Sequence, residues 1–258
     1  MPAPLTPSPA ALALPPEGSL ARSVALFRAF GAEQTDPAHF YSILAADTAR
    51  EVGRYAALRG AELVDVGGGP GYFADAFRAA GARYAGIDPS VGELTLRGST
   101  PEGFVRASGL DLPLADGSLD LCISSNVLEH VPEPERMASE MLRVVRLGGV
   151  IWLSWTLWLG PWGGHETAPW HYLGGQRAAD RYAVKHGHRP KNDFGTSLFH
   201  CSAGRMIRWA KHQRSRGAAD ILDVRPRYHP GWATWMAKLP GLREVAGWNM
   251  VIVMRRRQ

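Results

Sequence analysis

The sequence predicts an α/β fold in which helices cover both faces of a doubly wound, mostly parallel sheet. Between residues 61 and 156, short apolar runs that are typical of buried strands alternate with helical segments, and this alternation is characteristic of parallel sheets. The length of 258 residues, with 45% hydrophobic and 21% charged residues, suits one globular domain. No apolar run reaches the roughly 20 residues that a membrane-spanning helix needs, so we expect no membrane-spanning helix.

Two helices are expected before the sheet, at residues 19–30 and 37–58. Asp36 is a good N-cap for the second helix, and Pro37 suits its first turn. In the second helix apolar residues recur near helical spacing. The two helices are therefore expected to form an N-terminal helical cover over residues 19–58.

The first 18 residues consist mainly of Pro, Ala, Leu and Ser, and they are expected to form a flexible tail ahead of a single domain at residues 19–258. They lack the basic start and the long apolar stretch of a secretory signal, which favours a cytoplasmic protein. Cys122 and Cys201 are the only cysteines. This excludes a disulfide-rich scaffold and a Cys-rich zinc site.

The alternating segment begins with a strand, a glycine loop and a helix, and it ends in a fifth strand. Its elements are expected at residues 63–66 (strand), 67–71 (loop), 72–80 (helix), 84–87, 104–107 and 119–124 (strands), 133–145 (helix) and 150–155 (strand). The pattern breaks at residues 156–200, which are rich in Gly, Trp, His and Tyr. Long structureless loops are uncommon in compact domains, so this segment is expected to be an ordered insertion. Later elements are expected at residues 201–213 (helix), 221–224 (strand), 232–238 (helix) and 249–254 (strand).

Positive charge is concentrated between Arg177 and Arg216. Ten Lys or Arg residues lie in this segment against Asp180 and Asp193, so the segment carries +8 in a chain whose total is +5. The rest of the chain therefore carries a net charge of −3. Such segregation suits either a solvated helical face or an anionic partner.

The most informative stretch is the glycine loop, which runs from Gly67 to Gly71 between an expected strand and an expected helix. Glycines let the backbone approach a ligand closely, and a helix N-terminus offers unpaired N–H groups. A dinucleotide-binding loop needs its third glycine three positions after Gly69. This chain has Tyr72 there and places its third glycine one residue earlier, which argues against NAD.

Asp65, two residues before the first glycine of the loop, points in the same direction. Its carboxylate would repel a pyrophosphate but would suit the ammonium group of an amino acid. S-adenosylmethionine combines an amino-acid end with an adenosine end. Its positive sulfonium also makes a phosphate-binding loop unnecessary.

Residues 65–71 (DVGGGPG) resemble the first motif of class I S-adenosylmethionine-dependent methyltransferases. Three further segments resemble the type 11 group of these enzymes: residues 112–120 (LPLADGSLD), 124–131 (SSNVLEHV) and 140–149 (EMLRVVRLGG). The matches follow the order of the group over about residues 61–156. The resemblance implies S-adenosylmethionine as the cofactor and a seven-stranded sheet whose last strand is antiparallel.

The cofactor site that the resemblance implies lies at the ends of the first four strands. Its residues are Asp65, Gly67, Gly68, Gly69, Gly71, Asp88, Pro89, Ser108, Gly109, Leu110 and Asn126. Asp88 closes the second strand, 21 residues after Gly67, where a carboxylate can accept both ribose hydroxyls. The chain departs from the family at Ser108 and Gly109, where an Asp-Ala pair is common. The adenine contact is therefore expected from the Ser108 hydroxyl, from the backbone near Gly109 and Leu110, or from another residue.

Two groups of residues are candidates for catalysis. Glu129 and His130 follow the fourth strand, and the resemblance places them near the transferred methyl group, although His130 also suits a structural capping role. His165 lies in the insertion beside two glycines and suits a mobile general base. Four tryptophans in or directly before the insertion suit either an acceptor pocket or an internal core: Trp155, Trp158, Trp162 and Trp170.

No metal site is expected from the sequence. The histidine pairs His165/His171 and His186/His188 match no established ligand spacing. The function expected is methyl transfer to a small-molecule, lipid or glycan acceptor. Two alternatives stay open: an RNA methyltransferase that uses the basic segment 177–216, and a non-catalytic S-adenosylmethionine-binding module. Nucleic acid is the less favoured partner because no RNA-binding module is recognisable.

Overall fold

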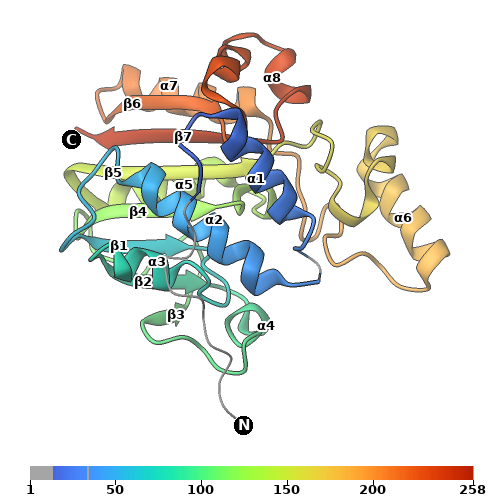
Figure 1. The fold of residues 1–258 in the computed structure, drawn as a ribbon, viewed down its shortest axis with the longest axis horizontal. Coiled ribbons are helices and arrows are strands. Elements are labelled where there is room, and N and C mark those ends of the chain that lie inside the picture. Colours follow the sequence, from blue (N-terminus) through green and yellow to red (C-terminus); the bar gives the residue numbers. More distant parts are fainter. Residues whose placement is uncertain (1–13, 34, 258) are drawn as a thin grey trace.

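The protein forms a seven-stranded sheet with the strand order β3-β2-β1-β4-β5-β7-β6 (Figure 1). The computed structural model describes residues 14–33 and 35–257. The strands are β1 (Glu62–Val66), β2 (Arg83–Asp88), β3 (Phe104–Arg106), β4 (Leu119–Ser125), β5 (Val145–Thr156), β6 (Ala219–Pro226) and β7 (Asn249–Arg256). Neighbouring strands from β3 to β5 are parallel, and β7 is antiparallel to both β5 and β6. The predicted fold class and the antiparallel last strand are confirmed.

The predicted helices are found in the predicted order. One unpredicted helix of 12 residues, α6 (Gly175–His186), lies in the insertion, and several short helices are also added. The α-helices are α1 (Leu20–Phe30), α2 (Pro37–Val52), α3 (Ala74–Ala79), α4 (Val91–Leu94), α5 (Pro134–Val144), α6 (Gly175–His186), α7 (Ala203–Ser215) and α8 (Leu242–Val245). The 3-10 helices are η2 (Leu128–His130), η3 (His165–Thr167), η4 (Trp170–Leu173) and η5 (Gly231–Lys238). The second predicted helix was too long: it ends at Val52, where Gly53 is the C-cap and its N–H bonds the Ala49 carbonyl.

Different helices cover the two faces of the sheet. Side chains along a strand alternate in direction, so neighbouring residues of one strand pack against different helices. Leu63 and Trp152 pack in the same hydrophobic cluster as residues of α2 and α3. Val64 and Ile151, their chain neighbours, pack in the cluster that contains α5 and α7. Figure 1 shows α1, α2 and α3 in front of the sheet and the insertion with α6 at its right-hand end.

The predicted tail is only partly within the described chain. Residues 1–13 lie outside the described residues. Leu14 and Pro15 lie beside α2, because their carbonyls accept hydrogen bonds from Arg50 of that helix. The carbonyl of Gly18 accepts a hydrogen bond of 2.7 Å from the N–H of Gly231, so residues 14–18 are bound to the domain. Among the helices of the described chain, none is both long and apolar enough to cross a membrane.

A buried ionic network joins the N-terminal helices to β6 and to the residue that follows it. Arg22 of α1 is 1% exposed and donates to Asp47 and Glu51 of α2, at 2.8 and 2.6 Å. Arg225 of β6 lies 3.0 Å from the Glu51 carboxylate. Arg22 also donates to the carbonyl of Arg227. Buried charges are tolerated only when they are paired in this way.

We expect Arg22→Ala to destabilise the protein by about 3–5 kcal/mol, because the substitution removes from two buried carboxylates one of the arginines that pair with each. Urea denaturation followed by circular dichroism measures the free energy of unfolding. Arg54→Ala is the matched control, since Arg54 forms an ion pair with Glu17 at the surface and such pairs contribute less than about 1 kcal/mol. Equal losses in the two variants would contradict a stabilising role for the network.

Candidate active site

The glycine loop joins β1 to α3 and lies against the segment that follows β4. Gly67 has a φ of +81°, and a Cβ added there would lie 2.5 Å from Cγ2 of Val127. Only glycine permits this contact. Gly69 has a φ of +49°, and nothing lies within 4 Å of the position of its Cβ. The loop is therefore packed against the protein at Gly67 and open at Gly69.

Asp65 is a buried carboxylate beneath this loop. It is 3% exposed, and the hydroxyl of Tyr84 donates a hydrogen bond of 2.5 Å to its Oδ2. Its Oδ1 is buried and has no hydrogen-bond partner. Burial raises the pKa of Asp65 to about 7, and the Tyr84 hydrogen bond offsets only part of that effect. The unpartnered Oδ1 of Asp65 is the oxygen atom left for a cationic ligand.

Asp88 and Pro89 stand at the end of β2, beside the loop. The Asp88 carboxylate accepts hydrogen bonds from the N–H groups of Gly69 and Ser90, at 3.1 and 2.8 Å. Burial raises the pKa of Asp88. Because β1 and β2 are parallel neighbours, Asp65 and Asp88 are brought to the same edge of the sheet, as expected for a ligand site of an open α/β sheet.

Ser108, Gly109 and Leu110 form a turn after β3. The exposed Ser108 accepts a hydrogen bond from the N–H of Leu110 through its hydroxyl oxygen. A Cβ at Gly109 would lie 2.8 Å from Cγ1 of Val66. Glycine at this position therefore lets the turn approach the end of β1, and the turn joins the edge that holds the glycine loop.

Asn126 directs its side chain into the protein. Its Oδ1 accepts hydrogen bonds from Arg227, Asn249 and Ser154 at 3.0, 2.9 and 3.2 Å, and its Nδ2 lies 3.3 Å from the hydroxyl of Tyr228. Its φ of 58° belongs to the left-handed region, which asparagine tolerates better than most residues. These bonds use the side chain to join β4, β5 and β7, and the N–H of Asn126 donates a hydrogen bond of 2.9 Å to the carbonyl of Ser154. Its carbonyl is therefore the backbone group left for a ligand.

Glu129 and His130 lie in η2, directly after the contact between Val127 and Gly67. The Glu129 side chain is 2% exposed; its Oε1 accepts a hydrogen bond of 2.9 Å from the N–H of Thr156, and its Oε2 has no partner. The Nδ1 of His130 lies 2.7 Å from the carbonyl oxygen of Ser197. A carbonyl only accepts, so Nδ1 carries the hydrogen and the Nε2 of neutral His130 is left as a lone pair.

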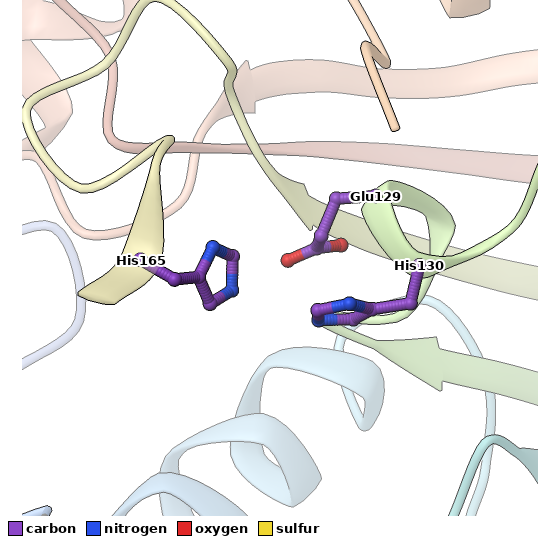
Figure 2. Close-up of side chains that lie close together, drawn as sticks. All are labelled: Glu129, His130 and His165. Carbon is purple, nitrogen blue, oxygen red and sulfur yellow. The ribbon is translucent and has the colours of Figure 1, made fainter. Parts of the chain in front are cut away.

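His165 comes to the same place from the insertion. Figure 2 shows its ring directed toward Glu129 and His130, and the ring centroids of the two histidines are 5.1 Å apart. One polar atom from each of the three side chains lies within 4.8 Å of the others. Burial, and to a lesser extent the neighbouring His130, lower the pKa of His165. The structure therefore brings together all three predicted catalytic residues.

The four candidate tryptophans, Trp155 at the end of β5 and three in the insertion, do not form a single wall. Trp155 is fully buried in the core, and its indole N–H donates to the carbonyl of Cys201. Trp158 packs on Phe194, and Trp170 is 44% exposed beneath the guanidinium of Arg181. Trp162 instead joins an aromatic cluster that includes Phe27, Phe30 and Trp248. Sequence patterning could not separate these four positions.

Sequence reasoning missed two residues at this edge. Tyr84 supplies the hydrogen bond to Asp65, but it reads as an ordinary strand residue. Lys191 of the insertion lies 3.0 Å from Glu93 of α4, so the insertion reaches the segment that follows β2. Neither residue belongs to a motif, and their partners are distant in sequence.

Comparisons with known proteins agree with this arrangement. A family model described as a methyltransferase domain matches residues 64–153. A relative from Mycobacterium sp. (strain KMS), named as an uncharacterized methyltransferase, is 53% identical over 245 residues, which cover 92% of this chain and 95% of the relative. A relative of the same name from Mycobacterium marinum is 51% identical over 246 residues and covers 92% and 94%. The chain belongs to this methyltransferase family.

The fold of this chain is similar to that of a methyltransferase of solved structure. The S-adenosylmethionine-dependent methyltransferase of Mesorhizobium loti superposes with a TM-score of 0.55 at 23% identity, over 80% of this chain and 96% of that one. The family and the fold make the protein an enzyme of the S-adenosylmethionine-dependent class. S-adenosylmethionine is accordingly its cofactor, as the sequence predicted.

We expect Asp65→Asn to stabilise the ligand-free methyltransferase at pH 8. The carboxyl has a pKa of about 7 in the folded protein against an ordinary 3.8, so the folded state binds this proton more tightly than the unfolded chain does. Stability is therefore lost as the pH rises from about 4 to about 7, by at most about 4 kcal/mol. Urea denaturation between pH 4 and 8 should show an advantage of the variant that shrinks toward pH 4.

The same substitution should weaken binding of S-adenosylmethionine by about 10- to 100-fold, because it removes a charged hydrogen-bond acceptor. Isothermal titration at pH 8 measures this affinity. Asp75→Asn is the control, since Asp75 is an exposed acid at the start of α3. A variant at Asp65 that is less stable at pH 8 and binds the cofactor normally would refute this assignment.

Proposed function

We propose that this methyltransferase modifies a small-molecule, lipid or glycan acceptor that binds between the glycine loop, helix α1 and the insertion. The observation that carries the proposal is the convergence of Glu129, His130 and His165 beside the glycine loop (Figure 2). An acceptor that carries a proton on its nucleophile needs such groups next to the transferred methyl.

The cofactor half of the site is proposed to use Asp65, Gly69 and Asp88. The unpartnered Oδ1 of Asp65 suits the ammonium of the methionine end. The open backbone at Gly69 leaves room for a ligand, and Asp88 stands where a carboxylate can accept ribose hydroxyls. When bound, S-adenosylmethionine supplies an electrophilic methyl group on a sulfonium.

The acceptor half is proposed to use Glu129, His130 and His165, here called the catalytic cluster, together with an aromatic wall. Trp162, Phe27, Phe30 and Trp248 pack on one another between α1, the insertion and the start of β7. Such a wall favours an acceptor with apolar or ring surface and excludes water from the methyl group. The lone pair of His130 and the bare oxygen of Glu129 can then hold the acceptor's polar group.

The RNA alternative loses support because the basic segment is divided in space. Of its ten basic residues, Arg189, Lys191 and Arg205 form ion pairs with carboxylates of the same chain. Helix α6 lies at the right-hand end of the molecule, whereas α7 lies behind β6 (Figure 1). The charge therefore does not gather into one stripe of the kind that tracks a nucleic-acid backbone.

We expect labelled S-adenosylmethionine to transfer its methyl group to the lipid, glycan or small-molecule fraction of a mycobacterial extract. His165→Asn should reduce turnover at least about 100-fold, as the loss of an acid–base group does, and should change cofactor affinity less than threefold. Asparagine suits this position because His165 has a φ of 49°. Scintillation counting of the separated fractions measures transfer.

His188→Asn is the matched control, because His188 is an exposed histidine of the same insertion. Label that appears in the RNA fraction would favour the alternative acceptor. The absence of label in every fraction, with intact cofactor binding, would favour the non-catalytic module.

A further inference from the structure

We propose that Glu129, His130 and His165 bind a divalent transition-metal ion. We propose further, and this second part rests on the function proposed above, that the ion binds an oxygen nucleophile of the acceptor. The catalytic cluster would then act as a metal site, although the spacing of histidines in the sequence predicts none.

The first argument is convergence. The polar ends of the three side chains are directed into one space (Figure 2), and one ligand atom from each lies within 4.8 Å of the other two. A tetrahedral ion with bonds of about 2.1 Å needs ligand atoms about 3.4 Å apart. A contraction of at most about 1.4 Å, within the reach of side-chain rotation, completes that geometry.

The second argument is that the three groups do not satisfy one another. Among these described side chains no hydrogen bond and no ion pair joins the carboxylate to either imidazole. The Oε2 of Glu129 is buried without a partner, although this residue is only 2% exposed. A buried bare carboxylate oxygen is costly, and an ion bound there would remove that cost.

The third argument is that Glu129 and His130 each have a backbone group as a hydrogen-bond partner on the side away from the cluster. The carbonyl of Ser197 accepts a hydrogen bond from Nδ1 of His130, and the N–H of Thr156 donates to Oε1 of Glu129. These bonds direct Nε2 of His130 and Oε2 of Glu129 into the cluster. Metal-binding histidines and carboxylates are usually oriented by partners of this kind.

The backbone at His165 adds a fourth observation. Its φ of 49° is uncommon for a residue other than glycine and is unfavourable for a side chain with a Cβ. The conformation holds the imidazole in the cluster, where its Nδ1 is buried without a hydrogen-bond partner. Strained residues of this kind gather at functional sites.

The donor set selects the class of ion. Two imidazoles and one carboxylate suit Zn²⁺, Fe²⁺, Co²⁺ or Ni²⁺ rather than Mg²⁺ or Ca²⁺, which prefer oxygen ligands. Three protein ligands leave at least one position open. An acceptor hydroxyl bound there would lose its proton to water and attack the methyl carbon through oxygen, while the electron pair of the broken carbon–sulfur bond stays on sulfur.

Cobalt titration of the full chain tests the site independently of activity. After treatment with a chelator and its removal, Co²⁺ should bind at about one ion per chain, with visible d–d absorption typical of a coordination number below six. Glu129→Gln and His165→Asn should each weaken this binding at least tenfold. Both variants should still bind S-adenosylmethionine, which shows that they are folded.

The control removes the other histidine pair. His186 and His188 lie at the exposed end of α6 with ring centroids 6.3 Å apart, so they are the main competitor for an added ion. The double substitution His186→Ala and His188→Ala should leave the cobalt absorption unchanged. Absorption that is lost in this control and kept in Glu129→Gln would overturn the proposal, as would the absence of stoichiometric binding.

A measurement of methyl transfer then tests the second part of the proposal, the binding of the acceptor by the ion, separately from the first part, the binding of the ion. Chelated enzyme should lose at least tenfold in methyl transfer and recover with Zn²⁺ or Co²⁺; full turnover after chelation would overturn the role of the ion in acceptor binding. Cobalt binding without any labelled acceptor fraction would count against the proposed function and leave the metal site supported.

Discussion

The close contact between the glycine loop and the end of β4 is the constraint on which the rest of the site depends. A side chain at Gly67 would collide with Val127, so the chain can pass here only without one. This contact joins the loop above Asp65 to Val127, two residues before Glu129. The parallel register of β1 between β2 and β4 then brings the proposed cofactor residues and the proposed catalytic residues to one edge.

A buried arginine holds the same edge to the helical cover. Arg227 donates through one terminal nitrogen to Ser125, Asn126 and Ser154, and through the other to Thr48 of α2. A lysine could not replace it, because only the planar guanidinium presents donors in two directions at once. Helix α2 of the N-terminal cover is therefore connected through hydrogen bonds to the turn that leads into η2.

The sequence predicted the parts of this protein that local physics determines. Alternating apolar runs and the spacing of Gly67, Gly69 and Gly71 depend on neighbours in the chain, so the sheet, the loop and the cofactor class followed from them. The role of the Asn126 side chain depends on Arg227 and Asn249, more than 100 residues away, and no motif records it. The grouping of His165 with Glu129 and His130 was also invisible, because the insertion returns to the sheet only in the folded protein.

The buried acids separate into those that stabilise the fold and those that are available to ligands. Glu51 also has an unpartnered oxygen, but Arg22 and Arg225 lie against its carboxylate. Asp65 and Glu129 have no cation within ion-pair distance among the described residues, and each keeps one oxygen bare at the carboxyl edge of the sheet. A fold selected for stability alone would neutralise such oxygens, since their burial is unfavourable. Their position on either side of the Gly67–Val127 contact supports the two ligands proposed above, with one cationic group at each acid.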